Sequence, residues 1–357
     1  MASVRVAVVG ATGAVGREMV RILEERSFPL GELVLFASPR SEGTRVAFGG
    51  EEIVVRALGP GWSRGVDLAL VSAGAAVSRE ALPPAAAEGT VCVDNSSAFR
   101  MDPEVPLVIP EVNPEALERH RGIVANPNCT AITALVPLAP LHRAFGLRFL
   151  VTSSYQSASG AGMKGVRELA RQVERLHGRE EELARPDPAA LPAGEVFPRT
   201  LAFNVVPWCE RLDPEGSGFT TEELKMGNEA RKILGIPDLP VAATAVRVPT
   251  VTGHGVAVYA RFERPLAPEA ARAVLAEAPG VEVVDDPAAG AFPTPLDAAG
   301  RDEVLVGRVR QPPGDERALL FFACGDNLRK GAALNAVQIA ERLVGAGLLT
   351  TGSASPR

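Results

Sequence analysis

Residues 4–16 read Val-Arg-Val-Ala-Val-Val-Gly-Ala-Thr-Gly-Ala-Val-Gly, an apolar run that ends in three regularly spaced glycines. The run Val4–Val9 predicts a short buried strand, and a helical pattern follows from Ala14 to about Arg26. Glycines between a strand and a helix let the backbone approach a pyrophosphate, which the N–H groups at the helix start can bind. The spacing is Gly-x-x-Gly-x-x-Gly, so the loop by itself indicates either a dinucleotide site or a turn that needs glycine for steric reasons.

Short apolar runs alternate with helical segments through the next hundred residues. The predicted strands after the first are Leu33–Ala37, Leu68–Ser72, Val91–Val93 and Ile123–Ala125. Strands separated by helices predict a Rossmann-type, doubly wound parallel sheet, which binds its ligands beyond the carboxyl ends of the strands. This part of the chain is therefore expected to be α/β.

The pattern of expected helices and strands changes after residue 130. A helix is expected from Cys129 to about Phe145, and a charged one from about Lys164 to Leu183. The later expected elements are strand Arg148–Ser154, the polar loop Arg185–Pro198, helix Thr220–Leu234, and strands Ala242–Val248, Val256–Arg261, Val304–Arg310 and Ala318–Ala323. Closely spaced strands indicate a mixed sheet in an α+β domain. A last helix, Leu328–Val344, suits packing on the first domain. We therefore predict a discontinuous first domain, residues 1–130 and 325–357, and a second domain, residues 131–324.

Composition excludes several classes of protein. The chain has 357 residues, which suggests about two domains. A net charge of −6 without a Lys/Arg block argues against a nucleic-acid binder. No apolar run is long enough to span a membrane, and the first residues contain no secretion signal. We therefore expect a cytoplasmic protein that binds neither nucleic acid nor membranes.

Four cysteines in this length cannot form a disulfide framework, and free thiols indicate a reducing compartment. Cys92 and Cys324 lie in apolar strands and Cys209 lies near a loop, so these three are expected to be packing residues. Cys129 differs because it opens a predicted helix, whose dipole stabilises a thiolate. Placement alone leaves two interpretations of Cys129 equally open, a nucleophile and a structural thiol.

A thiolate mechanism needs an acid or base that titrates near neutral pH. Of the four histidines, His254 is the best placed, because Thr252-Gly-His-Gly255 is expected to be a flexible loop between two strands. A loop histidine that is merely solvated is the alternative.

The end of the second predicted strand bears on the choice of dinucleotide. An NAD site usually carries Asp or Glu there, whereas this chain has Ser38-Pro-Arg40-Ser41. Hydroxyls and a guanidinium suit a 2′-phosphate, which favours NADP over NAD. A surface turn with an incidental arginine is the other interpretation.

Two arginines lie where structure alone does not require them. Arg100 follows a predicted strand, and Arg247 lies in an apolar strand, where a buried guanidinium would demand an anionic partner. Forked guanidinium contacts suit an anionic substrate. Glu222 and Lys225 are three residues apart on one helix face, which in itself indicates only a surface ion pair.

Five motifs together resemble aspartate-β-semialdehyde dehydrogenases. They are Gly10-Ala-Thr-Gly-Ala-Val-Gly16, Asn126-Pro-Asn-Cys-Thr130, Tyr155-Gln-Ser-Ala-Ser-Gly-Ala-Gly162, Arg247-Val-Pro249 with Gly253-His-Gly255, and Cys324-Gly-Asp-Asn-Leu-Arg-Lys-Gly331. The matches extend in order over nearly the whole chain, and those around Cys129 and Gln156 are the most specific. The resemblance implies reversible, NADPH-dependent reductive dephosphorylation of L-aspartyl 4-phosphate to L-aspartate 4-semialdehyde, in the biosynthesis of lysine, threonine, methionine and isoleucine.

The same resemblance implies a role for each matching residue. Cys129 would be the acylated nucleophile, His254 the acid and base, and Gln156 the residue that orients the acyl group. Arg247 and Glu222 would hold the α-carboxylate and the amino group of the substrate, and Arg100, Asn128 and Lys225 the phosphate. The implied NADP contacts are Gly10, Thr12, Gly13, Ala14, Val15, Gly16, Ser38, Arg40, Ser41, Ser159, Gly160 and Asn327. No metal is implied, and the family pattern is a homodimer formed by the second domain.

Three alternatives differ in class or substrate. N-acetyl-glutamyl-phosphate reductase uses the same thioester chemistry, but its nucleophile segment typically differs from Asn126–Thr130. A glyceraldehyde-phosphate dehydrogenase fits Ser38–Ser41 less well. A non-catalytic NADP-binding homologue would not need to retain Cys129, Gln156 and His254 together.

Overall fold

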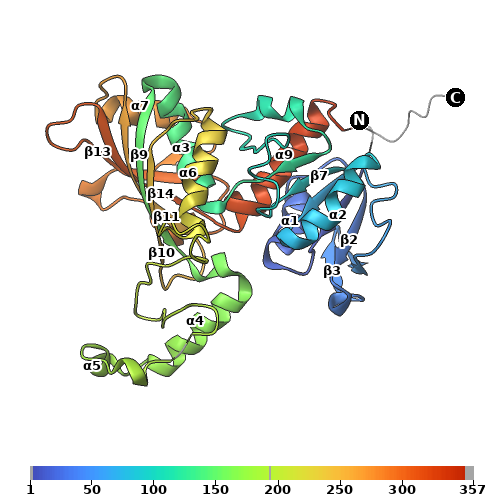
Figure 1. Cartoon of the computed structure of the whole chain (residues 1–357), viewed down its shortest axis with the longest axis horizontal. Helices are drawn as coiled ribbons and strands as arrows, with labels where there is room; N and C mark the ends of the chain where they lie inside the picture. Colours follow the sequence, from blue (N-terminus) through green and yellow to red (C-terminus); the bar gives the residue numbers. More distant parts are fainter. Residues whose placement is uncertain (1–2, 193, 350–357) are drawn as a thin grey trace. The chain divides into compact units, whose positions relative to one another are not determined.

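The opening run Val4–Val9 forms strand β1, and helix α1, Ala14–Glu25, follows it in the computed structural model (Figure 1). The structure describes residues 3–192 and 194–349. These residues divide into two compact units. The first contains the residues up to Ile132, the segment Asn228–Pro237 and the residues from Arg329 onward, and the second contains Thr133–Gly227 and Asp238–Leu328.

A six-stranded sheet with the order β5-β2-β1-β6-β7-β8 forms the centre of the first unit. Its other strands are β2 Leu30–Ala37, β5 Arg56–Ala57, β6 Leu68–Val71, β7 Val91–Asp94 and β8 Ile123–Ala125. Every neighbouring pair is parallel. The chain proceeds outward from β1 in one direction and from β6 in the other, which is the doubly wound arrangement. The predicted Rossmann-type sheet is confirmed.

Helices cover both faces of this sheet. Because β1→β2 and β6→β7 step in opposite directions, right-handed crossovers place α1 and α2, Ala75–Ala87, on opposite faces. Alternate strand residues such as Val6 and Val8 belong to one buried apolar cluster with α1 and with helix α9, Leu334–Gly345. The last helix therefore packs in the first unit, as its sequence suggested. The segment before it, Arg329–Ala333, is π-helical.

The second unit contains a mixed sheet with the order β10-β9-β11-β14-β13-β12. Its strands are β9 Leu147–Gln156, β10 Val241–Arg247, β11 His254–Phe262, β12 Val281–Val283, β13 Val304–Arg310 and β14 Ala318–Gly325. Strand β9 pairs parallel with β10 and antiparallel with β11, which confirms the predicted mixed sheet. Helix α3, Cys129–Phe145, starts and ends at the predicted residues.

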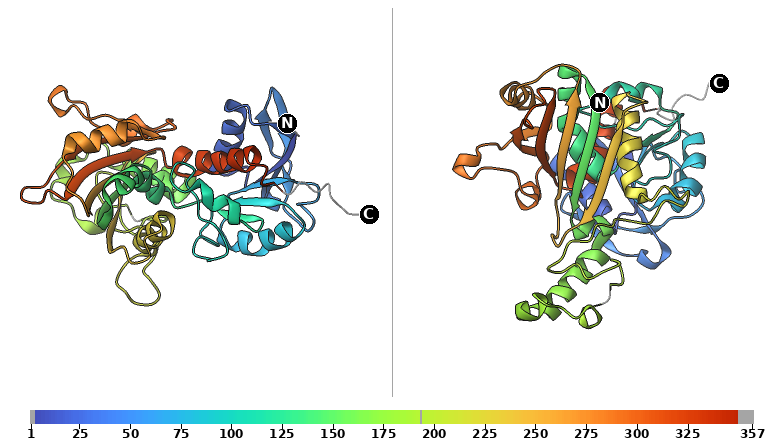
Figure 2. Two further views of the ribbon diagram at one scale, coloured as in Figure 1. Left: turned by 90° about the horizontal axis from the view of Figure 1, so that it is seen from above. Right: turned by 60° about the vertical axis from the view of Figure 1, so that its left-hand side comes forward.

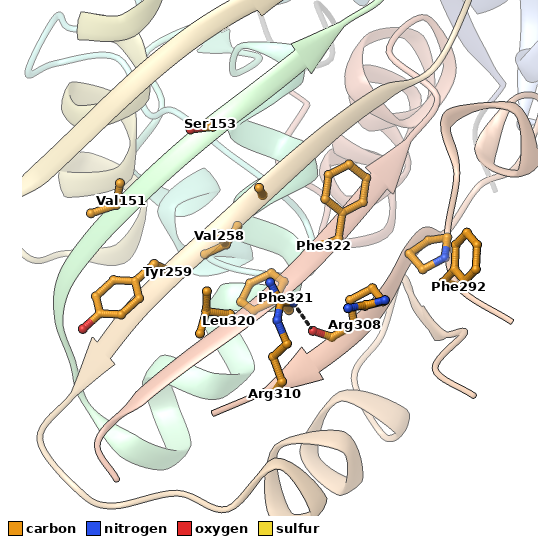
Figure 3. Close-up of a pocket in the computed structure, with 12 residues that line it drawn as sticks. Val151, Ser153, Val258, Tyr259, Phe292, Arg308, Arg310, Leu320, Phe321 and Phe322 are labelled. Carbon is orange, nitrogen blue, oxygen red and sulfur yellow. Dashed lines mark hydrogen bonds between the residues drawn. The ribbon is translucent and has the colours of Figure 1, made fainter. Parts of the chain in front are cut away.

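One face of the mixed sheet is packed and the other is open. On β9 the side chains of Leu150 and Thr152 are buried, whereas Tyr155 is 38% exposed. The open face is mainly apolar and forms a shallow hollow of about 460 Å³. Figure 3 shows its labelled side chains, which come from four strands and from the loop at Phe292.

Helix α6, Thr221–Leu234, has the N-terminal signature that its sequence suggested. The Oγ1 of Thr220 accepts the N–H of Glu223, and the Glu223 carboxylate accepts the N–H of Thr220. This reciprocal pair satisfies two backbone donors at the start of the helix. The helix therefore begins at a defined residue, which sets the direction of every side chain along it.

The predicted helix over Lys164–Leu183 is wrong as a single element. Helix α4, Gly162–Leu176, ends before Gly178, whose φ of +78° no helix interior can contain, and a short α5, Glu180–Leu183, follows. Helix α4 extends away from the sheet of its unit in Figure 1 and in the right-hand view of Figure 2.

Several short elements carried too little periodicity to be predicted. They are β3 Arg45–Phe48, β4 Glu51–Val54, α7 Pro268–Ala276, α8 Pro295–Ala298, and the 3-10 turns η1 Pro39–Ser41, η2 Pro114–Arg119, η3 Ala158–Ala161, η4 Pro188–Ala190 and η5 Pro287–Ala289. The helices in the described ranges are too short or too polar to span a lipid bilayer. Residues 350–357 of the predicted first domain lie outside the described residues.

Candidate active site

The loop after β1 is shaped by its glycines. Gly10 has a φ of +88°, and a Cβ there would collide with the carbonyl oxygen of Ser72 at the end of β6. A Cβ on Gly16 would collide with the carbonyl of Gly10. Gly13 precedes α1 and offers no side chain to cap it. The turn therefore needs glycine for steric reasons, and the start of α1 has no side-chain cap, which suits the binding of an anion there.

This loop borders a cavity of about 650 Å³ in the first unit. Of the predicted cofactor residues, Gly10, Thr12, Gly13 and Ser38 line it. Ala14, Val15, Gly16, Arg40 and Ser41 do not. The Oγ1 of Thr12 lies 3.3 Å from the Oγ of Ser41, and Arg40 is exposed on η1 directly after β2.

The opposite wall of the cavity was not predicted. It consists of the loop from Leu58 to Ser63 and of side chains from α2, including Val77 and Glu80. Within this loop the ring of Trp62 packs edge-on against Phe36, with 5.8 Å between the ring centroids. Gly-Pro-Gly-Trp is readable as a turn, but only the tertiary structure places it opposite the glycine loop.

Cys129 is the first residue of α3, as predicted. The Oδ1 of Asn128 accepts the N–H groups of Thr130, at 2.9 Å, and of Ala131, at 3.3 Å. Asn128 is therefore the N-cap of this helix. Its side-chain carbonyl oxygen is therefore engaged by the start of the helix.

All four cysteines lie in the described part of the chain, where none of them forms a disulfide, and they differ in exposure. Cys92, Cys209 and Cys324 are buried, whereas Cys129 is partly exposed. Burial raises the pKa of the Cys92 and Cys324 thiols to about 12, which keeps both protonated and unreactive. The prediction that these three cysteines are packing residues is confirmed.

Arg100 is buried and bound from three sides in the first unit. Its Nε donates to the carbonyl of Asn126 at 2.9 Å, and its Nη2 to the carbonyl of Asn95 at 2.9 Å. Its Nη1 lies 3.0 Å from the carboxylate of Glu229, a residue of α6 that the sequence did not single out. The acidic partner that a buried arginine requires is thus present inside the protein.

In the second unit, Gln156, Arg247 and His254 lie at the same end of three neighbouring strands of the sheet. Gln156 ends β9 and Arg247 ends β10, and the two are paired in the parallel register. His254 begins the antiparallel neighbour β11. The three side chains are nearly or completely buried. Residues about a hundred positions apart in sequence therefore form one constellation.

The expectation that His254 lies in a flexible loop is wrong. It is the first residue of β11 and its side chain is 0% exposed. Its Nδ1 accepts the backbone N–H of Ser157 at 3.2 Å, so the neutral ring carries its proton on Nε2. Nε2 is buried and has no hydrogen-bond partner among the described residues. Burial, and secondarily the charge of Arg247, lower the pKa of His254 to about 3.

Ser159 and Asn327 belong to a buried network around this histidine. The Oδ1 of Asn327 accepts the hydroxyls of Ser157 and Ser159 and the N–H of Gly253. Gly160 packs against His254 and Arg247, since a Cβ there would lie 2.6 Å from Nη1 of Arg247. These predicted cofactor residues thus hold the two turns that flank His254.

Glu222 and Lys225 form the ion pair that their spacing predicted, with 3.3 Å between the charged atoms. The pair is not an ordinary surface pair, because the Glu222 side chain is 6% exposed and its Oε1 accepts Nε2 of Gln156 at 3.1 Å. Lys225 also contacts the carboxylate of Glu210.

Arg247 differs from Arg100 in its partners. Its Nη1 donates to the carbonyl of Ser157 at 2.7 Å, and its guanidinium lies over the ring of Phe197. No carboxylate among the described residues pairs with it. A buried, uncompensated guanidinium is a site for an external anion.

Comparison with known proteins gives the class. Residues 5–120 match the domain described as "Semialdehyde dehydrogenase, NAD binding domain", and residues 138–330 match "Semialdehyde dehydrogenase, dimerisation domain". The chain is therefore an oxidoreductase with an NAD(P)-binding domain.

Several known proteins are similar to this chain over nearly their whole length. The chain is 46% identical to the aspartate-semialdehyde dehydrogenase of Aquifex aeolicus, over 97% of this chain and 99% of that protein. It is 49% identical to that of Mycolicibacterium smegmatis, over 95% and 99%. The crystal structure of aspartate semialdehyde dehydrogenase II from Vibrio cholerae superposes with a TM-score of 0.89 at 42% identity, over 96% and 99%. The chain belongs to the aspartate-semialdehyde dehydrogenase family.

Burial of neutral His254 predicts a specific loss of stability in acid. The unfolded chain protonates this histidine below its ordinary pKa of 6.5, whereas the folded protein resists protonation down to about 3. Stability is therefore lost as pH falls from 6.5 towards 3, by about 2 kcal/mol for His254 between about pH 7 and about pH 5.

Urea unfolding of the wild type and of His254→Asn at both pH values measures this loss. The variant should lose about 2 kcal/mol less stability than the wild type on acidification. Equal losses in the two proteins would contradict the buried, neutral state of His254.

Proposed function

We propose that this protein catalyses the NADP-dependent, reversible reductive dephosphorylation of L-aspartyl 4-phosphate to L-aspartate 4-semialdehyde, in the biosynthesis of lysine, threonine, methionine and isoleucine. Family membership supports the substrate, and a Vibrio cholerae relative was solved complexed with ASA. The observation that carries the chemistry is the partly exposed Cys129 at the capped start of α3.

Cys129 serves as the nucleophile. In the direction of semialdehyde oxidation, its sulfur bonds to the aldehyde carbon and the carbonyl π pair moves to oxygen, which gives a tetrahedral thiohemiacetal. Loss of hydride from that carbon leaves a thioester on Cys129. A phosphate oxygen then attacks the thioester, and the C–S bond breaks to release the acyl phosphate and the thiolate. The positive end of the α3 dipole favours the negative charge in each tetrahedral state.

His254 stabilises the negative charge on the substrate oxygen. Because Nδ1 is bound by Ser157, the neutral ring offers the N–H of Nε2, which donates a hydrogen bond to the oxyanion and keeps its proton. Gln156 orients the acyl group from the same sheet edge, and its amide is held by Glu222. The orphaned Nε2 atom supports this role, since a buried donor without a partner is costly unless a ligand uses it.

The charged residues bind the two ends of the substrate. Arg247 holds the α-carboxylate, because no carboxylate among the described residues neutralises it, and Glu222 holds the amino group. Arg100, Asn128 and Lys225 bind phosphate. Two anionic groups on the substrates explain the need for several cations.

The cavity beside the glycine loop fits a dinucleotide. The glycine loop has no room for a Cβ at two of its glycines, and the start of α1 has no side-chain cap. Both features suit the binding of a pyrophosphate. Ser38 lines the cavity at the end of β2, where an NAD site usually has a carboxylate, so we assign NADP. Thr12–Val15, Arg40, Ser41, Ser159, Gly160 and Asn327 complete the proposed contacts. Bound NADP⁺ would supply the hydride acceptor for this oxidation.

The open face of the mixed sheet is proposed to pair with a second copy of the chain. It lies within the residues that match a dimerisation domain. Apolar side chains of β9, β11 and β14, including Val151, Leu320 and Phe322, face the hollow in Figure 3. A cytoplasmic location remains a prediction from the four free cysteines.

Replacing the nucleophile tests the thioester mechanism. Cys129→Ser should lower kcat for phosphate-dependent NADP⁺ reduction with L-aspartate 4-semialdehyde by about a thousandfold or more, because serine is a far weaker nucleophile. The matched control is Cys92→Ser, which changes a buried thiol of β7 and should alter only stability. Equal activity of the wild type and Cys129→Ser would refute the mechanism, and faster turnover of N-acetylglutamate semialdehyde would select the reductase alternative.

A carboxylate at the end of β2 tests the cofactor assignment. Ser38→Asp should lower kcat/KM for NADP⁺ by about tenfold or more through repulsion of the 2′-phosphate, and should leave NAD⁺ less affected. Initial rates with each cofactor, with Ser38→Asn as the neutral control, measure the effect. A wild-type enzyme that uses NAD⁺ as well as NADP⁺ would contradict the assignment.

A charge on the open sheet face tests the dimer. Leu320→Glu should convert a dimer into monomers, because a desolvated carboxylate in an apolar interface is costly. Light scattering after size-exclusion chromatography measures the mass, and the exposed Glu80→Gln of α2 is the control. A monomeric wild type, or a Leu320→Glu protein that stays dimeric, would show that this face is not the interface.

A further inference from the structure

Glu229 lies on α6, seven residues after Glu222, and its side chain is 1% exposed. Its two carboxylate oxygens have different partners. Oε1 accepts Nη1 of Arg100 at 3.0 Å, and Oε2 accepts the backbone N–H of Asn128 at 2.6 Å. One buried carboxylate thus joins a proposed phosphate ligand to the residue that directly precedes Cys129.

The contacts of Arg100 define its orientation completely. Nε is held by the carbonyl of Asn126, Nη2 by that of Asn95, and Nη1 by Glu229. Among the described residues, the second hydrogen on each Nη atom has no acceptor. A planar guanidinium held on three sides can present only these hydrogens to an oxyanion.

Lys232 holds the backbone of the same loop. Its Nζ donates to the carbonyls of Arg100, Asp102 and Val105, each at 2.7–2.8 Å. Lys232 follows Glu229 by three residues, so both project from one side of α6. The loop is therefore bound through its arginine side chain by one residue of α6 and through its carbonyls by another.

We infer that Glu229 is a positioning residue that aims Arg100 at phosphate and fixes the turn before Cys129, with Lys232 as its support. This inference rests on the proposed function, since it assumes that Arg100 binds phosphate. A buried carboxylate is costly to desolvate, and here one guanidinium and one backbone N–H of the first unit offset that cost. Glu229 does not contact the substrate in this assignment and acts through its two neighbours.

The test separates the two substrates. Glu229→Gln retains the shape of the side chain but loses its charge, and its amide NH₂ must face one of two donors. We expect KM for inorganic phosphate to rise about tenfold or more, because Arg100 loses its fixed orientation. KM for L-aspartate 4-semialdehyde should change by less than about threefold, because Arg247 and Glu222 are untouched. A rise in both constants by the same factor would overturn the inference.

Asp285→Asn is the matched control. The Asp285 side chain is 1% exposed and also binds one arginine, Arg272, and the backbone N–H of Arg308. Its neutralisation should lower stability without raising KM for phosphate. If Glu229→Gln does not fold, Lys232→Met supplies the second variant, since this half-buried side chain holds only loop carbonyls. It should raise the phosphate KM in the same sense, and an unchanged value would count against the inference.

Arg100→Ala distinguishes failure of the inference from failure of the proposed function. If KM for phosphate is unchanged in Arg100→Ala, then Arg100 does not bind phosphate and that part of the proposed function is wrong. A large rise in Arg100→Ala with none in Glu229→Gln would overturn only the role of Glu229. In the double variant Arg100→Ala/Glu229→Gln the phosphate KM should rise by clearly less than the product of the two single effects, because Glu229 acts largely through Arg100. Additive effects would indicate a separate structural role and overturn the inference.

Discussion

The start of helix α3 is the constraint on which the chemistry depends. Its first N–H groups must be satisfied, and Asn128 satisfies two of them while Cys129 occupies the first helical position. Asn126, two residues before Asn128, is held in turn, because its Oδ1 accepts Nδ2 of Asn335 at 2.7 Å. Lys330 binds Oδ1 of Asn335 at 3.0 Å, within a buried polar cluster. A residue of α9, remote in sequence, thus supports the turn that presents the thiol.

The second unit positions its candidate site residues by strand pairing instead of by a capped helix. In a mixed sheet, parallel strands end where their antiparallel neighbour begins. The last residues of two strands therefore lie beside the first residue of a third. Gln156, Arg247 and His254 occupy these positions. Because the strands are paired through their backbones, the register of the sheet fixes the positions of these three residues. A loop would hold them less precisely. Side chains at strand ends combine rigid support with access to a ligand.

The parts of the site that could be predicted are those with local signals. Cys129 follows a strand and opens a helix, Ser38 ends a strand, and the glycine loop lies between β1 and α1, all of which local periodicity and residue type indicate. His254 was misplaced because glycines on both sides of it are typical of a loop, whereas sheet pairing with β9 and β14 extends the strand to it. Glu229 gave no signal, because an acidic residue in a polar helix usually faces solvent.

The amino-acid sequence by itself determined the order of strands and helices, the two kinds of sheet, and the thiol at a helix start. These depend on hydrophobic period, glycine and capping residues, which act over a few positions along the chain. Only the tertiary structure decided which charges are neutralised. Arg100 has an internal carboxylate and Arg247 has none among the described residues, although both are single arginines beside apolar strands. The difference arises because burial sets the cost of a charge, and partners from distant segments determine whether that cost is met.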